Sequence, residues 1–176
     1  VHCGFLAQAI AEGAQMPKAE SLFVRGLLHD IGHLVLFSHY PAECRQAMAH
    51  SDEGLDARLY EEHKLIGVDA MQFAAELARV WQLPNSFVDS FQHLMRPEDV
   101  AGPLAREIAV LHIAVQFSSG IDSDLLIEEI VERIRPPIWR IAELPPDVGA
   151  AALDASTVGM VDAMYKVLTR DEDTLS

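Results

Sequence analysis

Apolar residues recur every three or four positions along most of the chain, which is the spacing of one face of an α-helix. In the clearest amphipathic stretch, residues 68–82, we expect the inward-facing side chains to be Met71, Ala74, Ala75, Ala78 and either Leu77 or Trp81. No stretch alternates apolar and polar residues over a useful length, so no strand is expected. Proline and glycine breaks divide the pattern into predicted helices over 2–13, 17–30, 55–66, 68–82, 85–94, 104–118, 124–134 and 155–168, with another opening at Pro41. The pattern predicts an all-α, orthogonal multi-helix bundle.

Composition and charge narrow the classes of function. The chain has 176 residues, half of them hydrophobic, which is enough for one cored domain or a close pair of helical lobes. With 13 basic and 27 acidic residues its net charge is −14. A field of that sign repels phosphate backbones, so we expect no nucleic-acid partner. The basic residues are scattered singly, so no Arg or Lys cluster favours free nucleotides either.

Several features indicate a cytoplasmic protein with no membrane span. The longest apolar runs, such as residues 31–37, are too short to cross a bilayer, and no leader peptide opens the chain. Cys3 and Cys44 provide neither a disulfide framework nor a four-thiolate zinc site. The chain starts at Val1 inside what reads as a helix, so we expect it to be part of a longer protein.

His29 and Asp30 are the most suggestive pair for chemistry. Neighbouring side chains on a helix point about 100° apart, so both reach one ion only from a helix end or a distorted turn. Gly32 would supply such a distortion. Imidazole and carboxylate together suit a divalent ion such as Zn, Mn or Fe. Taken alone, the pair has a simpler interpretation, a histidine at a helix carboxyl end beside a solvated Asp.

The surrounding residues resemble a known family. Residues 23–32, Phe-Val-Arg-Gly-Leu-Leu-His-Asp-Ile-Gly, are similar to the His-Asp segment of the HD superfamily, and specifically of its HDOD branch of bacterial signalling proteins. Further similarities follow in order at His2 with Leu6–Ala7, Tyr60–Glu62 with Gly67, Leu77–Pro84, Phe91–Pro97 and Ile108–Gly120. The resemblance implies a bundle of the HD-domain type.

The same resemblance implies a division of the chain. Residues 1–120 would form the HD-like core, residues 121–170 a helical extension packed on it, and residues 171–176 a frayed polar tail. The helical half that precedes these motifs in HDOD domains is missing, in agreement with the expectation of a longer protein.

The resemblance also assigns metal ligands. HD enzymes hold an ion with a His, a His-Asp pair and a distant Asp, which correspond here to His2, His29 and Asp30, while the distant Asp falls on Val115. The family's middle His falls on Ala70, and its later His pair retains only His93. We therefore expect either no cofactor or a weak, vestigial site for Fe, Mn or Zn, with His33, Glu62 and His93 as neighbours.

His33, His63 and Glu62 each have two possible interpretations. His33 follows His29 by four residues, a chelating spacing on a regular helix, but Gly32 intervenes. His63 is a solvated helix residue or a substitute for the lost middle His, and Glu62 is part of a solvated face or a buried cap. His112 lies on an apolar helix, where a core residue with a hydrogen-bonded ring is expected.

Three functions follow from these patterns. The leading one is a non-catalytic signalling module that acts through a protein partner, with a homodimer as a further option. The second is a metal-dependent phosphohydrolase that uses His2, His29 and Asp30. The third is a helical sensor that binds a small ligand or metal in the old pocket without turnover. Bound metal and turnover of phosphodiesters would separate them.

Overall fold

Helices account for the architecture of the protein. The computed structural model describes residues 1–50, 54–149, 151–157 and 159, and this part of the chain contains no strand. The all-α prediction is therefore confirmed. The helices are α1 (His2–Gly13), α2 (Ala19–Leu28), α3 (Ile31–His39), α4 (Pro41–Met48), α5 (Leu55–Ile66), α6 (Ala70–Val80), α7 (Asn85–Gln92), the short 3₁₀ turn η2 (Pro97–Asp99), α8 (Pro103–Asp122), α9 (Ile127–Arg133) and α10 (Pro136–Ala142).

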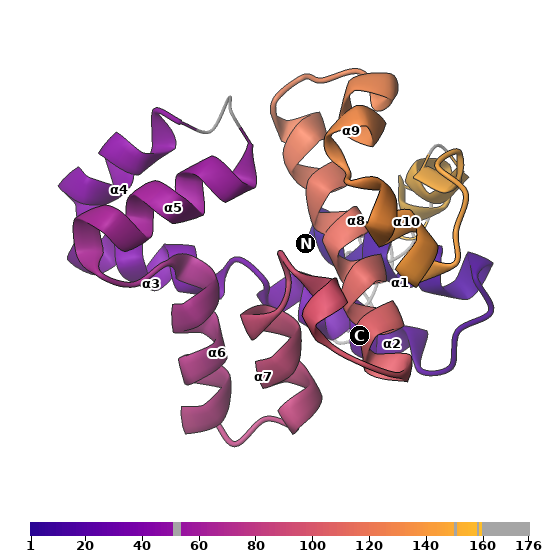
Figure 1. The fold of residues 1–176 in the computed structure, drawn as a ribbon, viewed down its shortest axis with the longest axis horizontal. Helices are drawn as coiled ribbons and strands as arrows, with labels where there is room; N and C mark the ends of the chain where they lie inside the picture. Colours follow the sequence, from indigo (N-terminus) through magenta and orange to yellow (C-terminus); the bar gives the residue numbers. More distant parts are fainter. Residues whose placement is uncertain (51–53, 150, 158, 160–176) are drawn as a thin grey trace, which may run out of the picture.

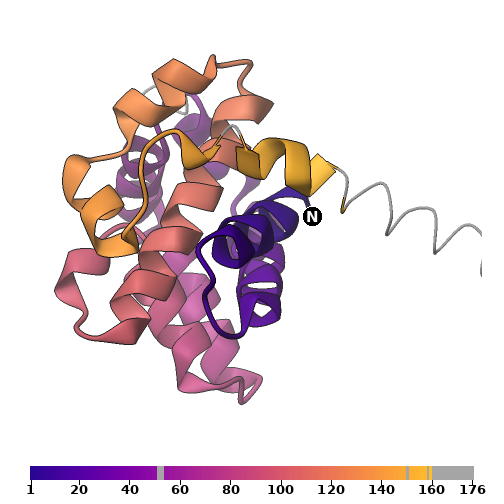
Figure 2. The ribbon, with the colours of Figure 1, turned by 90° about the vertical axis from the view of Figure 1, so that its right-hand side faces the viewer.

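The long helix α8 is the centre of the bundle (Figure 1). Twelve of its twenty residues are buried, on all sides of the helix, because α1, α2, α7, α9 and α10 pack around it. The largest hydrophobic cluster joins α8 to α1 and α10 and includes Leu6, Ile10, Phe117 and Ile138. Residues after α10 return across α8, where Gly149 lies against Phe117, toward the amino-terminal end of α1 (Figure 2).

Helices α3, α4 and α5 form a second group beside this centre (Figure 1). They connect to it through α6 and α7, whose small cluster of Ala74, Ala78, Phe87 and Phe91 also receives Leu28 and Ile31. Because Leu28 ends α2 and Ile31 begins α3, this cluster fixes the turn between them.

A buried ion pair ties α2 to α7 and α8. The Arg25 guanidinium lies 2.6 Å from Glu107 and donates to Ser90 Oγ at 2.9 Å, and it also stacks over the Phe87 ring. Arg25 is 3% exposed, so the pair compensates a charge that would otherwise be costly to bury.

Helix boundaries depart from the sequence prediction in a few places. Helix α2 ends at Leu28, so His29 and Asp30 form a turn of their own. Asn85, a residue type that favours the N-cap position, is instead the first residue of α7 and makes no capping bond. Of the two alternatives for the remaining inward position, Trp81 follows α6 and is half exposed, whereas Leu77 is partly buried, so the structure favours Leu77. Met71, Ala74, Ala75 and Ala78 are buried as expected.

Other expectations concern segments that lie partly or wholly outside the described residues. The closing helix expected over 155–168 is described only at 155–157 and 159, which are helical. Residues 51–54, whose Ser-Asp-Glu-Gly sequence is typical of a turn, are described only at Gly54. The tail at 171–176 lies outside the described residues, and the division of the chain at residue 120 stays a prediction. Within the described residues, no helix is both long enough and apolar enough to span a bilayer.

Candidate functional site

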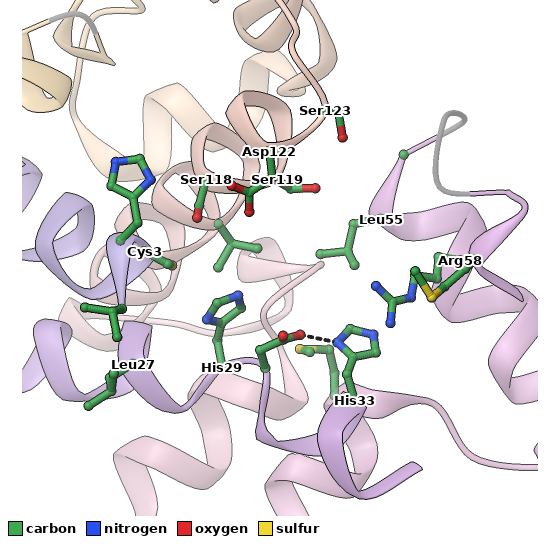
Figure 3. Close-up of a pocket in the computed structure, with 17 residues that line it drawn as sticks. Cys3, Leu27, His29, His33, Leu55, Arg58, Ser118, Ser119, Asp122 and Ser123 are labelled. Atoms are coloured by element: carbon green, nitrogen blue, oxygen red, sulfur yellow. Dashed lines mark hydrogen bonds and ion pairs between the residues drawn. The ribbon is translucent and has the colours of Figure 1, made fainter. Parts of the chain in front are cut away.

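A pocket of about 430 Å³ lies between the α1–α2–α8 side of the molecule and α3, α4 and α5 (Figure 3). All three residues predicted to bind metal, His2, His29 and Asp30, line this pocket, and so does His33. Its other lining residues are Val1, Cys3, Leu27, Met48, Gly54, Leu55, Arg58, Met71, Val115, Ser118, Ser119, Asp122 and Ser123. Residues far apart in sequence thus meet in one concave site.

The turn between α2 and α3 presents His29 and Asp30 to the pocket. The Nδ1 atom of His29 lies 2.6 Å from the Gly26 carbonyl oxygen, which can only accept, so Nδ1 carries the proton and Nε2 is the free acceptor. Burial lowers the pKa of His29, against the hydrogen bond to Gly26 and the charge of Asp30, and so favours the neutral ring.

His33 lies between two carboxylates. Its Nδ1 atom is in short contact with Asp30 Oδ1, and its Nε2 atom lies 3.1 Å from Glu62 Oε1, with the ring N–H poorly aligned for a hydrogen bond. Burial alone would lower the pKa of His33, but the interactions with Asp30 and Glu62 outweigh it and raise the pKa. At Asp30 burial would raise the pKa, but the hydrogen bond to His33 and the charges of His33, His29 and Arg58 outweigh it and hold the pKa below the ordinary value.

Glu62 is fully buried and acts as the anchor of this network. Its Oε1 accepts from Arg58 Nε at 3.0 Å, and its Oε2 accepts from the backbone N–H of Ala70, the first residue of α6, at 3.0 Å. Burial alone would raise the pKa of Glu62, but contacts with His33, Ala70 and Arg58 together outweigh burial, so the pKa lies below its ordinary value. The interpretation of Glu62 as a buried cap is confirmed.

Gly32 serves packing rather than distortion of the His-Asp turn. It is a regular residue of α3, and a Cβ atom built on it would collide with the Ala70 carbonyl oxygen. The expected distortion is instead the turn at His29 and Asp30. Ala70, where the family's middle His would fall, is buried in this α3–α6 contact.

One face of α8 forms the opposite wall. Val115, Ser118, Ser119 and Asp122 follow one another at helical spacing and all line the pocket. Val115 stands where the resemblance places the distant metal-binding Asp, and it presents only methyl groups. The carboxylate of Asp122 lies two turns further along α8.

These residues do not fit a closed metal centre. Among the described residues, no group of three or more His, Cys, Asp and Glu side chains is arranged to hold an ion. Asp30 is paired with His33, and Val115 offers no donor atom. His2, His29 and Asp30 therefore share a pocket without forming a ligand set.

The other candidate histidines lie elsewhere. His93 lines a separate, smaller depression with Met95, Arg96 and Asp99. His63 contacts Gln72 on an exposed face and does not replace the missing middle His. His112 is buried, and its Nδ1 donates to the Leu94 carbonyl at 2.9 Å, which confirms the prediction of a core histidine.

Sequence reasoning missed Arg58, Asp122 and the serines of α8. The sequence does not indicate a role for Arg58, because it is a single basic residue on a polar helix. Only the folded structure places it at the pocket. The serines and Asp122 follow Val115 at helical spacing, so continuing that face from the family position would have found them.

Comparison with known proteins places the first part of the chain in a family. Residues 1–97 match the HDOD domain. A search of curated proteins gave no significant match to this sequence.

Two crystal structures share the fold. An HDOD domain protein of unknown function from Geobacter sulfurreducens is 21% identical, with a TM-score of 0.70 over 93% of this chain and 59% of that chain. A provisionally named phosphohydrolase from Shewanella amazonensis is 22% identical, with a TM-score of 0.63 over 89% of this chain and 60% of that chain. The chain thus spans about three fifths of the length of each.

Proposed function

Because the chain belongs to the HDOD domain family, we propose that it is a non-catalytic signal-transduction module that acts through a protein partner in the bacterial cytoplasm. The observation that carries this proposal is the donor set of the pocket. Val115 replaces the expected carboxylate, and Asp30 is engaged by His33. The pocket lies where the family's metal site is expected but lacks some of the side chains that would bind the metal. This loss favours a structural or sensing role over turnover.

A protein partner agrees with the charge and with the exposed apolar side chains. The net charge of −14 opposes binding to nucleic acid. Val24 and Leu27 on α2, and Leu34 and Phe37 on α3, are more than a third exposed and lie on either side of the His29–Asp30 turn. Exposed apolar residues at helical spacing suit packing against another protein, including a second copy of this chain.

A metal-dependent phosphohydrolase is the alternative, with His2, His29 and Asp30 holding Fe, Mn or Zn. One observation favours it, the presence of Arg58 in the pocket, since a guanidinium stabilises phosphate charge. The name of the Shewanella amazonensis protein agrees with that activity but belongs to that protein.

Metal content and turnover separate the two proposals. Purified protein is loaded with Fe, Mn or Zn, desalted and analysed for metal, then assayed with bis(p-nitrophenyl) phosphate. We expect substoichiometric metal and no turnover. Stoichiometric metal with hydrolysis, both lost in His29→Ala and retained in His93→Ala, would establish the enzyme instead, because His93 lies outside the pocket.

A further inference from the structure

We propose that the pocket binds a small hydroxylated anion, a polyol that carries one phosphate or carboxylate group, between Arg58 and the Ser119–Asp122 face of α8. This inference deepens the proposed function and rests on it, since the ligand is bound as a signal and is not turned over.

Arg58 provides the site for the anionic group. Its Nε atom donates to Glu62, while Nη1 and Nη2 have no hydrogen-bond or ion-pair partner among the residues that the structure describes. The guanidinium points toward the pocket in Figure 3, and the side chain is 20% exposed. A guanidinium held at one nitrogen keeps its two terminal nitrogens free as a planar fork, which suits carboxylate and phosphate oxygens.

Glu62 makes this fork rigid. Because Glu62 is fully buried and also accepts from the Ala70 N–H, it cannot follow Arg58 into solvent. The ion pair therefore fixes the direction of the guanidinium before any ligand arrives, which reduces the entropy lost on binding. A lysine at this position would have the charge without the fork.

The wall opposite Arg58 favours hydroxyl groups. Ser118, Ser119 and Ser123 can both donate and accept hydrogen bonds, and the Asp122 carboxylate accepts only. Asp122 has no hydrogen-bond partner among the described residues, so its oxygens are available to ligand hydroxyls. Its charge would also repel a second anionic group, which limits the ligand to one acidic end.

Beside the His29–Asp30 turn and His33, the remaining lining includes apolar side chains that suit a small carbon skeleton. Leu55, Met48 and Met71 supply apolar contact between the two polar walls. The volume of about 430 Å³ falls in the range of small-molecule sites, roughly 300–1,000 Å³. A molecule of the size of a hexose phosphate fits these limits.

The test uses three probes with related hydroxylated skeletons: glucose 6-phosphate, gluconate and glucose. Binding is measured by titration calorimetry at millimolar concentrations, with inorganic phosphate as a fourth probe. We expect at least one of the two charged sugars to bind at least about tenfold more tightly than glucose and inorganic phosphate. Comparison of glucose 6-phosphate with gluconate then shows whether phosphate or carboxylate is preferred.

Variants locate the site. Arg58→Gln should weaken binding of the charged sugar roughly tenfold or more. The matched control is Arg79→Gln, an arginine on α6 outside the pocket. Because Arg58 also supports Glu62, the folding of Arg58→Gln is checked by its Tm. Asp122 is exposed, so Asp122→Ala should not disturb the fold. We expect this variant to lower the ratio of the affinity for the charged sugar to the affinity for the matching simple anion, phosphate or acetate. The ratio is used because loss of the Asp122 charge changes the affinity for both anions alike through its long-range effect.

The outcomes separate this inference from the proposed function. Three results would overturn the inference and leave the non-catalytic role intact. Neither charged sugar binds, the charged sugar binds Arg58→Gln as tightly as the wild type, or glucose binds as tightly as the charged sugar. Release of phosphate from glucose 6-phosphate by metal-loaded protein overturns the non-catalytic role, while dependence of binding on Arg58 would still support the site.

Discussion

Glu62 is the residue on which the charged side chains behind the pocket converge. Replacement by alanine would leave the Ala70 N–H and Arg58 without their common acceptor, and His33 without the neighbouring carboxylate charge. We expect Glu62→Ala to lower the free energy of unfolding by about 3 kcal/mol, since breaking a buried charge network leaves uncompensated groups. Urea denaturation measures this loss.

Two variants control that measurement. Glu62→Gln keeps an acceptor for the Ala70 N–H and should cost less than Glu62→Ala. Glu76 is an exposed partner of Arg79, so Glu76→Ala should change the free energy of unfolding by less than about 0.5 kcal/mol. Equal losses for Glu62→Ala and Glu76→Ala would show that the buried network does not stabilise the fold.

His33 makes this stability depend on pH. Burial lowers its pKa, but Asp30 and Glu62 outweigh burial and raise it, so folding favours the protonated ring. The contribution of His33 is therefore complete below its ordinary pKa of about 6.5 and is lost as pH rises through the raised value. Asp30 and Glu62, whose pKa values are lowered, contribute above their ordinary values and lose that contribution as pH falls through the lowered ones.

Comparison of wild type with His33→Gln tests this sign. The variant should lose more free energy of unfolding at about pH 5.5 than at about pH 9, because only the protonated ring gains from both carboxylates. Urea denaturation of both proteins at each pH gives the two differences. A larger loss at the higher pH would mean that His33 is buried as the neutral ring.

Helix packing at Gly32 is the clearest constraint at the scale of an element. A methyl group there would meet the Ala70 backbone, so α3 and α6 would have to move apart. We expect Gly32→Ala to cost about 2–4 kcal/mol or to prevent folding. Gly13→Ala is the matched control, since Gly13 ends α1 with open space around it and should gain up to about 1 kcal/mol. Thermal unfolding of both variants measures the difference, and similar Tm values would contradict the packing role.

The helices could be predicted because their apolar spacing is local. Helices α1 and α5 begin and end where the sequence places them, at His2–Gly13 and Leu55–Ile66. The sequence left Trp81 open as an alternative to Leu77 because it extends the apolar stripe of α6, whereas the helix ends one residue earlier and Gln82 turns the chain with a positive φ. Whether the last residue of a stripe is covered depends on the tertiary partner.

The pocket was only partly predictable for the same reason. The family resemblance led to His2, His29 and Asp30, and folding brings these residues together at one pocket. Nothing local indicates that Arg58 would face them, or that Glu62 would bind Ala70, eight residues later, while holding Arg58. His93 matched the family by order along the chain, yet α7 carries it to another surface.

At the scale of the whole molecule, apolar side chains are concentrated in the interior and charged side chains at the surface. Among the described residues, the α8 centre is largely apolar and its buried guanidinium, Arg25, pairs with Glu107, whereas most of the acidic residues are exposed. The described surface ion pairs, such as Arg135 with Glu98, engage only a few of them. Because acidic residues outnumber basic ones by two to one, the folded chain repels itself at neutral pH.

This self-repulsion predicts how salt affects stability. Raising NaCl from about 20 to about 200 mM shortens the Debye length from roughly 20 Å to roughly 7 Å, so repulsion between distant carboxylates is screened. We expect Tm at pH 7.5 to rise by about 2–4 °C, which corresponds to about 1 kcal/mol for a domain of this size. At about pH 5.5, close to the isoelectric point of about 4.8, the rise should nearly vanish because the net charge is small. Differential scanning calorimetry at both pH values measures the two shifts. An equal rise at both would point to a general salt effect, and a fall at pH 7.5 would mean that screening of the ion pairs outweighs relief of the repulsion.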